Sequence, residues 1–271
     1  MRTTAAATEI SSNFVRQIIR RRHLIWNFVR RDLHSRYVGS MGGLVWSLVH
    51  PLVLLASYYF VFQIVLKVRI GTPGDNFAVF VFAAILPWLF MQDTLARSST
   101  SVVDNASLLK KTVFPSEILP LAILGSNLIT HILSLLLFAI VLALLGLGAW
   151  TSILIPLYIL PLMGLAVGLA WFVAALQVFV RDTSQVLAVG LVFWFWFTPI
   201  FYRLQDVPAA LRPVIEWNPL TFVMEGYRSL LLEGVVPSAA GLAFLWFVGL
   251  LALLGGGAVF RSTKREFVDV L

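Results

Sequence analysis

The sequence predicts an all-helical membrane protein that crosses the bilayer several times. Hydrophobic residues make up 59% of its 271 residues and charged residues only 12%, and the mean hydropathy of +0.90 is too high for a soluble domain of this length. Apolar segments of near-spanning length follow one another along the chain. They are residues 44–66, 77–95, 118–147, 153–180, 186–202 and 239–260.

The remaining composition excludes several functional classes. The net charge of +7 could indicate a nucleic-acid partner, but the cations lie between apolar blocks, so we expect no nucleic acid. The absence of cysteine excludes disulfides, thiolate catalysis and cysteine-ligated metal sites. The four histidines form no i, i+4 pair and the carboxylates form no catalytic couple. We therefore predict neither a metal site nor a catalytic residue.

Residues 1–43 form a basic leader before the first apolar segment. Its apolar residues recur at helical spacing, which predicts an amphipathic helix at the anionic cytoplasmic face of the bilayer. They are Phe14, Ile18, Ile25, Val29 and Leu33. A generic surface anchor and an interface helix that also contacts a cytoplasmic partner both fit this pattern. The leader shows no small-residue cleavage site, so we do not expect a cleaved signal peptide.

The six apolar segments differ in length. As a helix, residues 44–66 would be about 35 Å long, enough for a hydrocarbon core of about 30 Å. Residues 186–202 are marginal. Arg181 and Asp182 interrupt the apolar tract before them, which predicts a tight turn rather than one continuous helix. We predict six transmembrane helices, with five as the alternative.

The positions of the cations predict the orientation. With the N-terminus inside, 15 of the 20 Lys and Arg residues fall in cytoplasmic segments. The positive-inside rule therefore predicts cytoplasmic N- and C-termini, with residues 261–271 as a cytoplasmic tail.

The polar segment 98–117, between the second and third spans, predicts a short cytoplasmic helix. Cap residues come first, followed by an apolar ridge, two cations and a proline that ends the helix. In order these are Asp104 or Asn105, Leu108 and Leu109, Lys110 and Lys111, and Pro115. An exposed leucine pair favours a protein partner, although a linker helix packed on its own chain fits the same residues.

The outer segment 203–238 predicts two short helices, of which the second can dip into the membrane without crossing it. Asn218 and Pro219 start the second helix. Its 13 or so residues would be about 20 Å long, too short to span. Glu225 and Arg228, three residues apart, can pair on it.

Five runs of sequence together resemble a known family. They are RRDLHSRYVGSMGGLVWSLVHPL from Arg30, LPWLFMQDTL from Leu86, VDNASLLKKTVFPSEILPL from Val103, VFVRDTSQVLAVGLVFWFWFTPIFY from Val178, and WNPLTFVMEGYRSLLLEG from Trp217. In this order and spacing they resemble the polysaccharide-export permeases of ABC transporters. Those permeases move lipid-linked O-antigen, capsular or teichoic-acid polymers across the bacterial inner membrane.

The resemblance implies a transport subunit and not an enzyme. It implies a homodimer with two copies of a separate ATPase that holds the ATP and Mg²⁺, with membrane lipids and a lipid-linked polysaccharide of O-antigen or capsule type as further partners. A teichoic acid is the alternative polymer. Independently, the chain contains no G-x-x-x-x-G-K-[ST] loop, so it has no Walker-type nucleotide site of its own.

The resemblance also implies roles for particular residues. Segment 98–117 becomes a coupling helix that inserts into a groove on the ATPase, through Asp104, Asn105, Leu108, Leu109, Lys110, Lys111, Phe114, Pro115 and Glu117. The end of the leader becomes a gate for the glycan lipid, with Arg30, Arg31, Asp32, Arg36, Tyr37, Gly39, Gly42 and Gly43. The outer segment becomes a pair of re-entrant helices that carry Asn218, Pro219, Glu225 and Arg228.

Aromatic residues near the ends of the spans are candidates for the glycan channel. Rings with an apolar face and a polar edge suit a sliding sugar polymer, and the candidates are Trp46, Tyr58, Tyr59, Trp88 and Phe90. An interfacial aromatic belt explains the same distribution.

Two other functional classes remain for comparison. A membrane-embedded transferase would need clustered acidic residues with a metal, whereas the acids are scattered. An ion-coupled transporter would favour repeated halves and buried carboxylates, and the sequence shows neither. We expect His131, inside the third span, to form an interhelical hydrogen bond rather than a proton relay.

Overall fold

The computed structural model describes residues 20–37, 45–68, 76–111 and 114–271. Helix is the only regular secondary structure in these residues, which confirms the all-helical prediction. The predicted gate glycines Gly39, Gly42 and Gly43 lie outside the described residues, as does the part of the leader before residue 20.

Four long, apolar helices form the body of the molecule, and each is long enough to cross a membrane. They are α4 (Phe77–Asp104), α6 (Ile118–Leu144), α7 (Pro156–Phe179), preceded by the 3-10 helix η3 (Trp150–Leu154), and α11 (Ala239–Thr263). The other predicted spans correspond to shorter apolar helices. These are α3 (Trp46–Tyr58), which continues as the π-helix η2 (Tyr59–Val65), and α8 (Thr183–Trp196). Four of the six predicted crossings thus have full-length helices.

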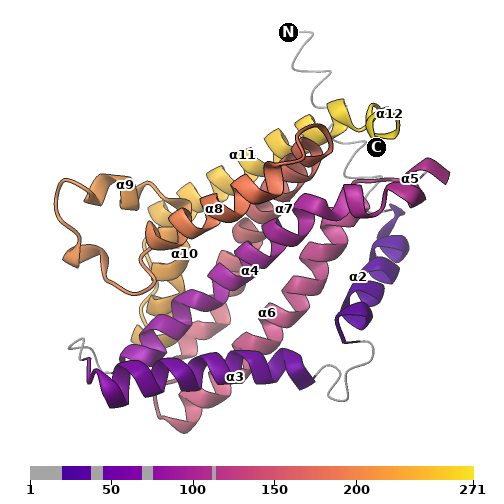
Figure 1. The fold of residues 1–271 in the computed structure, drawn as a ribbon. Helices are drawn as coiled ribbons and strands as arrows, with labels where there is room; N and C mark the ends of the chain where they lie inside the picture. Colours follow the sequence, from indigo (N-terminus) through magenta and orange to yellow (C-terminus); the bar gives the residue numbers. More distant parts are fainter. Residues whose placement is uncertain (1–19, 38–44, 69–75, 112–113) are drawn as a thin grey trace.

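α4 runs through the middle of the bundle and contacts α6 and α7, while α11 packs on the far side against α7 (Figure 1). Most of the side chains of α4 are buried against α6, α7, α8 and α10. In contrast, α8 buries only Thr183 and Leu191, and much of the apolar surface of α3 and η2 is exposed. Apolar helices on the surface fit a molecule whose surroundings are lipid or further protein.

α7 and α11 pack closely because both helices place glycines at their contact. An added Cβ on Gly168 would overlap backbone atoms of Ala252, and one on Gly249 would lie 2.5 Å from the carbonyl oxygen of Pro161. Gly164 and Gly168 stand four residues apart on α7, the small-xxx-small spacing that lets helix backbones approach each other.

The end of α4 differs from its predicted position, whereas the turn between α7 and α8 agrees with its own. α4 continues to Asp104, beyond the expected end at residue 95, because serines in this stretch are satisfied within the helix: Ser99 and Ser101 donate to the carbonyls of Ala96 and Ser98 at 2.7 Å. The short helix predicted in segment 98–117 is therefore only α5 (Ala106–Lys111). The tight turn between α7 and α8 lies where it was predicted, between Phe179 and Thr183.

Shorter helices lie at the two ends of the bundle (Figure 1). At one end are α5 and α12 (Phe267–Val270), which contact each other, and the start of α2 (Arg22–Tyr37), which packs along α6. At the other end are the 3-10 helix η4 (Leu204–Asp206), α9 (Arg212–Glu216), α10 (Pro219–Arg228) and the π-helix η5 (Ser229–Glu233). The expected cytoplasmic and outer segments thus separate to opposite ends.

Candidate functional site

The short helix α5 projects from the end of the bundle but is partly packed on its own chain. Leu109 is only 7% exposed and belongs to the main hydrophobic core, and Leu108 is half-buried. The exposed side chains of this segment are Asp104, Ser107 and Lys110, with Val103 beside them. Leu108 and Leu109 are therefore not an exposed pair, and the surface offered to a partner is mostly polar.

Asp104 and Asn105 do not cap α5 in the way expected. Asp104 is the last residue of α4, and the Asn105 side chain donates to the Ser101 carbonyl oxygen at 2.8 Å. The Asn105 backbone oxygen accepts from the amides of Leu108 and Leu109. Asn105 therefore forms the junction between α4 and α5, and Lys111 ends α5.

Glu117 and Phe114 connect the loop after α5 to the rest of the chain. The buried Glu117 carboxylate pairs with Arg21 at 3.1 Å and with Lys264 at 3.4 Å, and its backbone oxygen accepts from the Trp171 indole at 3.2 Å. The Phe114 ring lies 5.1 Å from that of Phe28 on α2, and the adjacent Pro115 is half-buried. Glu117 thus joins the leader, the loop and the C-terminal end of α11 from inside the molecule.

A charged cluster joins α2 to α4 and α6. Asp32 pairs with Arg36 one turn later at 3.2 Å and with Arg97 of α4. It also accepts a hydrogen bond from Ser126 of α6. Arg36 donates to Ser126 at 2.9 Å, and both arginines donate to the Asn127 amide oxygen. Two guanidiniums around one carboxylate leave this cluster with a net positive charge.

Other residues predicted for the gate lie around this cluster. Arg30 and Arg31 are exposed on α2, and the Arg31 guanidinium stacks 4.4 Å from the Phe28 ring. Tyr37 is the last residue of α2. The sequence did not single out Arg97, Ser126 and Asn127. Of these three residues, only Arg97 could have been noticed in the sequence, as a cation that follows an apolar run.

A cavity of about 370 Å³ adjoins the cluster between α3, α4 and α6. Its polar lining comes from α2 and from the apolar helices α3, α4 and α6, and comprises Arg36, His50, Asp93, Asn127, Thr130, His131 and Ser134. Polar side chains at this depth are costly unless they face a cavity or one another. The cavity is therefore a candidate site for a polar group that enters between α3 and α6.

At the other end, Arg228 anchors α10 to the bundle. Its side chain is 2% exposed and pairs with Glu225 at 3.2 Å, which confirms the predicted pair. It also donates to the Phe80 carbonyl oxygen at 3.3 Å and the Ile200 carbonyl oxygen at 2.6 Å, and the guanidinium lies 3.5 Å from the centre of the Phe80 ring. Burial lowers the pKa of Arg228 to about 10, although Glu225 opposes the shift, so the group remains charged at neutral pH.

Asn218 fixes the start of α10. Its side-chain oxygen accepts from the Leu220 amide at 3.1 Å, an N-cap followed by Pro219 at the first helical position. The same oxygen accepts from the Trp194 indole at 3.0 Å, and the Asn218 amide donates to Thr198 at 3.0 Å. Asn218 therefore caps α10 and ties it to the end of α8.

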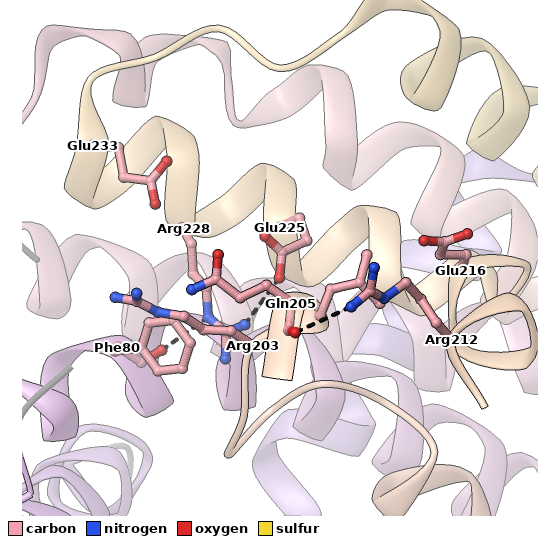
Figure 2. A pocket seen from close by; sticks show the side chains of 9 residues that line it. Phe80, Arg203, Gln205, Arg212, Glu216, Glu225, Arg228 and Glu233 are labelled. Atoms are coloured by element: carbon pink, nitrogen blue, oxygen red, sulfur yellow. Dashed lines mark hydrogen bonds and ion pairs between the residues drawn. The ribbon is translucent and has the colours of Figure 1, made fainter. Parts of the chain in front are cut away.

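A second cavity, of about 430 Å³, lies beside Arg228 and is lined mainly by charged side chains (Figure 2). Residues of η4, α9, α10 and η5 meet the start of α4 there. They are Phe80, Arg203, Leu204, Gln205, Arg212, Glu216, Glu225, Arg228 and Glu233.

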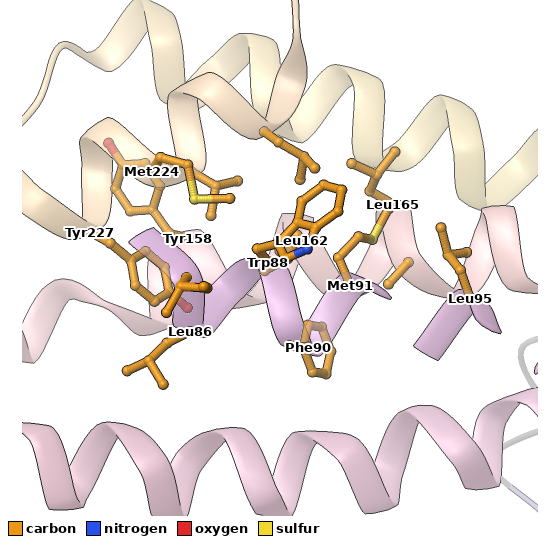
Figure 3. Packing of buried hydrophobic residues seen from close by; sticks show 14 of the residues in the cluster. Leu86, Trp88, Phe90, Met91, Leu95, Tyr158, Leu162, Leu165, Met224 and Tyr227 are labelled. Carbon is orange, nitrogen blue, oxygen red and sulfur yellow. The ribbon is translucent and has the colours of Figure 1, made fainter. Parts of the chain in front are cut away.

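The aromatic channel candidates divide into exposed and buried residues. Trp46 is 53% exposed and Tyr59 is also exposed, whereas Tyr58 packs against Phe62 and Phe201. Trp88 is 2% exposed and its indole donates to Gln92 at 2.6 Å. Figure 3 shows Trp88 among the side chains of the core, with Phe90 pointing the other way. In this conformation Trp88 offers no surface to a polymer, while Phe90 lines the cavity between α3 and α6.

His131 makes the expected hydrogen bond between helices. Its Nε2 lies 2.9 Å from the hydroxyl of the buried Tyr227, and its ring lies 5.2 Å from that of Phe90. His131 therefore links α6 to α10 through a polar contact inside the bundle.

The fold and these sites define a class of protein. The chain is a multi-pass helical membrane protein, with a charged cluster at one end, re-entrant-length helices at the other and no group of metal-binding side chains in the residues that the structure describes. The sequence model of the ABC-2 type transporter family matches residues 23–232. The chain belongs to this family, and it is a transport subunit.

Similar proteins have been named in several bacteria. The O-antigen export system permease protein RfbA of Myxococcus xanthus is 28% identical over 262 residues, which cover 94% of this chain and 98% of that protein. An RfbA of Klebsiella pneumoniae is 29% identical, over 89% of this chain and 92% of its own length. The polysialic acid transport protein KpsM of Escherichia coli is 21% identical, with 88% and 92% covered.

Proposed function

We propose that this chain is the channel-forming subunit of an ATP-driven exporter that moves lipid-linked polysaccharide of the O-antigen or capsule type from the cytoplasm across the bacterial inner membrane. One observation carries the proposal. The family match over residues 23–232 is accompanied by relatives named as O-antigen export permeases, whose similarity extends over almost the entire chain. A teichoic-acid polymer is the alternative, but none of the three relatives described above is named for one.

The proposed topology has six crossings with both termini in the cytoplasm. α3 with η2 and α8 form the first and fifth crossings, in addition to the four long helices. The distribution of the cations supports this orientation. α2, α5 and α12 then lie at the cytoplasmic face, and η4, α9, α10 and η5 lie at the outer face.

The proposed assembly is a homodimer with two copies of a separate ATPase that binds ATP and Mg²⁺. The absence of a Walker-type loop from the sequence supports a separate ATPase. Two helices with exposed apolar faces support the pairing of two copies. On α8 the exposed side chains are Val186, Val189, Val192, Phe193 and Trp196, and on α3 and η2 they include Trp46, Val53, Tyr59 and Phe60. A channel built between these faces would be lined in part by Trp46 and Tyr59.

The proposed route of coupling runs from α5 through internal contacts. The exposed Asp104, Ser107 and Lys110 contact the ATPase, while the buried Leu109 and Glu117 carry a displacement of α5 to α2, α7 and α11. Since Asp32 ties α2 to α4 and α6, movement of α2 would also open or close the adjoining cavity. We place the gate for the glycan lipid at this cavity.

A deletion and complementation experiment tests the proposal. Loss of the gene should remove the polysaccharide from the cell surface and leave the lipid-linked polymer inside, and the wild-type chain should restore export. A Lys110→Glu chain should be inserted normally but co-purify with less ATPase. Normal surface polysaccharide in the deletion strain would show that the proposed function is wrong.

A further inference from the structure

The outer cavity contains a balanced set of charges. Its charged lining residues are Arg203, Arg212, Arg228, Glu216, Glu225 and Glu233, so three guanidiniums face three carboxylates. They come from four short segments and converge on one space (Figure 2). The volume of about 430 Å³ falls within the range of about 300–1,000 Å³ typical of small-ligand pockets. Size and chemistry both fit a small polar ligand.

Two arginine donors at this cavity have no acceptor in the described part of the chain. They are Nη2 of Arg203 and Nε of Arg212, both buried. The Arg212 guanidinium is nevertheless held in place, because its Nη2 donates to the carbonyl oxygens of Gln205 at 3.1 Å and Val207 at 3.3 Å. Buried donors in native proteins are almost always satisfied. The two guanidiniums that line the cavity therefore have hydrogen-bonding capacity that the described part of the chain does not use.

The carboxylates supply the complementary acceptors. Glu225 pairs with Arg228 at 3.2 Å and forms part of the wall. Glu216 is exposed on α9, and Glu233 accepts from Ser229 at 3.2 Å. A small anion bound here would approach three carboxylates, and a cation would approach three guanidiniums. A neutral ligand whose groups both donate and accept hydrogen bonds avoids both penalties, and sugar hydroxyls have this property.

We infer that the outer cavity is a saccharide-binding subsite for neutral sugar rings of the exported polymer. The inference rests on the proposed function, which supplies the polymer. Sugar hydroxyls accept from Arg203 and Arg212 and donate to Glu216 and Glu233, while the Arg228–Glu225 pair holds the wall of the subsite. Residues of α9 and α10 line the cavity, and these helices lie at the end of the bundle opposite α5 (Figure 1). In the proposed topology this is the end at which the polymer leaves the membrane.

Direct binding tests the subsite. The full chain, purified in lipid nanodiscs together with its associated subunits, is titrated with short oligosaccharides released from the host's own surface polysaccharide by partial acid hydrolysis. Wild type should bind them, and Arg212→Gln combined with Glu216→Gln should raise the Kd by about tenfold or more, since hydrogen bonds to charged groups are lost. Arg181→Gln, in the turn between α7 and α8, is the matched control and should bind like wild type.

The single variant Glu216→Gln separates loss of binding from misfolding, because this side chain is exposed and glutamine keeps its shape. It should weaken oligosaccharide binding while the elution volume and melting temperature stay unchanged. Equal affinity in wild type and the pocket variants, absence of binding to wild type, or competition by inorganic phosphate would each overturn the inference. If deletion of the gene abolishes export but pocket variants bind normally, the subsite is wrong and the proposed function stands. Export that persists after deletion refutes the function instead.

Discussion

Replacement of Gly168 by alanine should disrupt the contact between α7 and α11. The new Cβ would overlap the backbone of Ala252 and lie 2.5 Å from the backbone nitrogen of Leu253. Because these neighbours are backbone atoms, no side chain can rotate away. Relief of the Leu253 contact alone to 3.4 Å requires the helices to separate by about 0.9 Å, and the Ala252 atoms, which lie closer still, require more.

Such a separation would weaken the most extensive helix–helix contact among the described residues. Overpacking of this kind typically costs about 1–3 kcal/mol, and dispersion contacts along the remaining interface are lost as well. Two glycines in similar helices serve as controls, because an added Cβ at Gly190 of α8 or Gly255 of α11 meets nothing within 4 Å. Alanine there should be neutral or stabilise the helix by about 0.5–1 kcal/mol.

The assay compares these single alanine variants in detergent. Each is heated in steps, and the fraction that remains monodisperse by size-exclusion chromatography gives an apparent melting temperature. Gly168→Ala should melt clearly below wild type, and Gly190→Ala and Gly255→Ala at or above it. If Gly168→Ala were as stable as Gly255→Ala, the close approach of α7 and α11 would be refuted.

Four further substitutions probe the two ends of the bundle. Arg228→Met should destabilise the chain by about 2–4 kcal/mol, because the carbonyl groups of Phe80 and Ile200 lose their buried donor. Glu225→Gln changes the more exposed partner of the pair and should cost less than about 1 kcal/mol. Equal melting temperatures of the two variants would argue against Arg228 as the anchor of α10. Asp32→Asn should leave Arg36 and Arg97 without their carboxylate, so the backbone amides of α2 should exchange hydrogen about tenfold faster or more. An unchanged exchange rate would contradict the idea that the charged cluster holds α2 on α4 and α6. Lys110→Glu should reduce co-purification of the ATPase without a change in melting temperature, and normal recovery of the ATPase would place the contact elsewhere.

Local sequence signals predicted local structure well. The Glu225–Arg228 pair follows from their spacing of three on a helix, and the turn after Phe179 follows from charged residues inside an apolar tract. The Asn218–Pro219 dipeptide likewise marks the start of α10. Each of these features depends on residues only a few positions apart.

Other predictions could not succeed on pattern alone. Leu108 and Leu109 look alike in the sequence, but Leu109 belongs to the hydrophobic core and is buried more deeply than Leu108. Trp88 was a channel candidate beside Tyr59, yet one lies in the core and the other on the surface. Hydropathy does not separate a helix face that meets lipid from one that meets protein, because both environments are apolar.

The sequence by itself determined that this chain is helical and resides in a membrane, because composition and apolar length act through the bilayer and not through particular contacts. The placement of its cations predicts which end lies inside. Only the tertiary structure decided that α4 lies at the centre, that Asp32 meets Arg97 and Ser126, and that Arg228 closes on Phe80 and Ile200. These contacts join residues far apart in the chain. They arise from the packing of whole helices, which no local periodicity records.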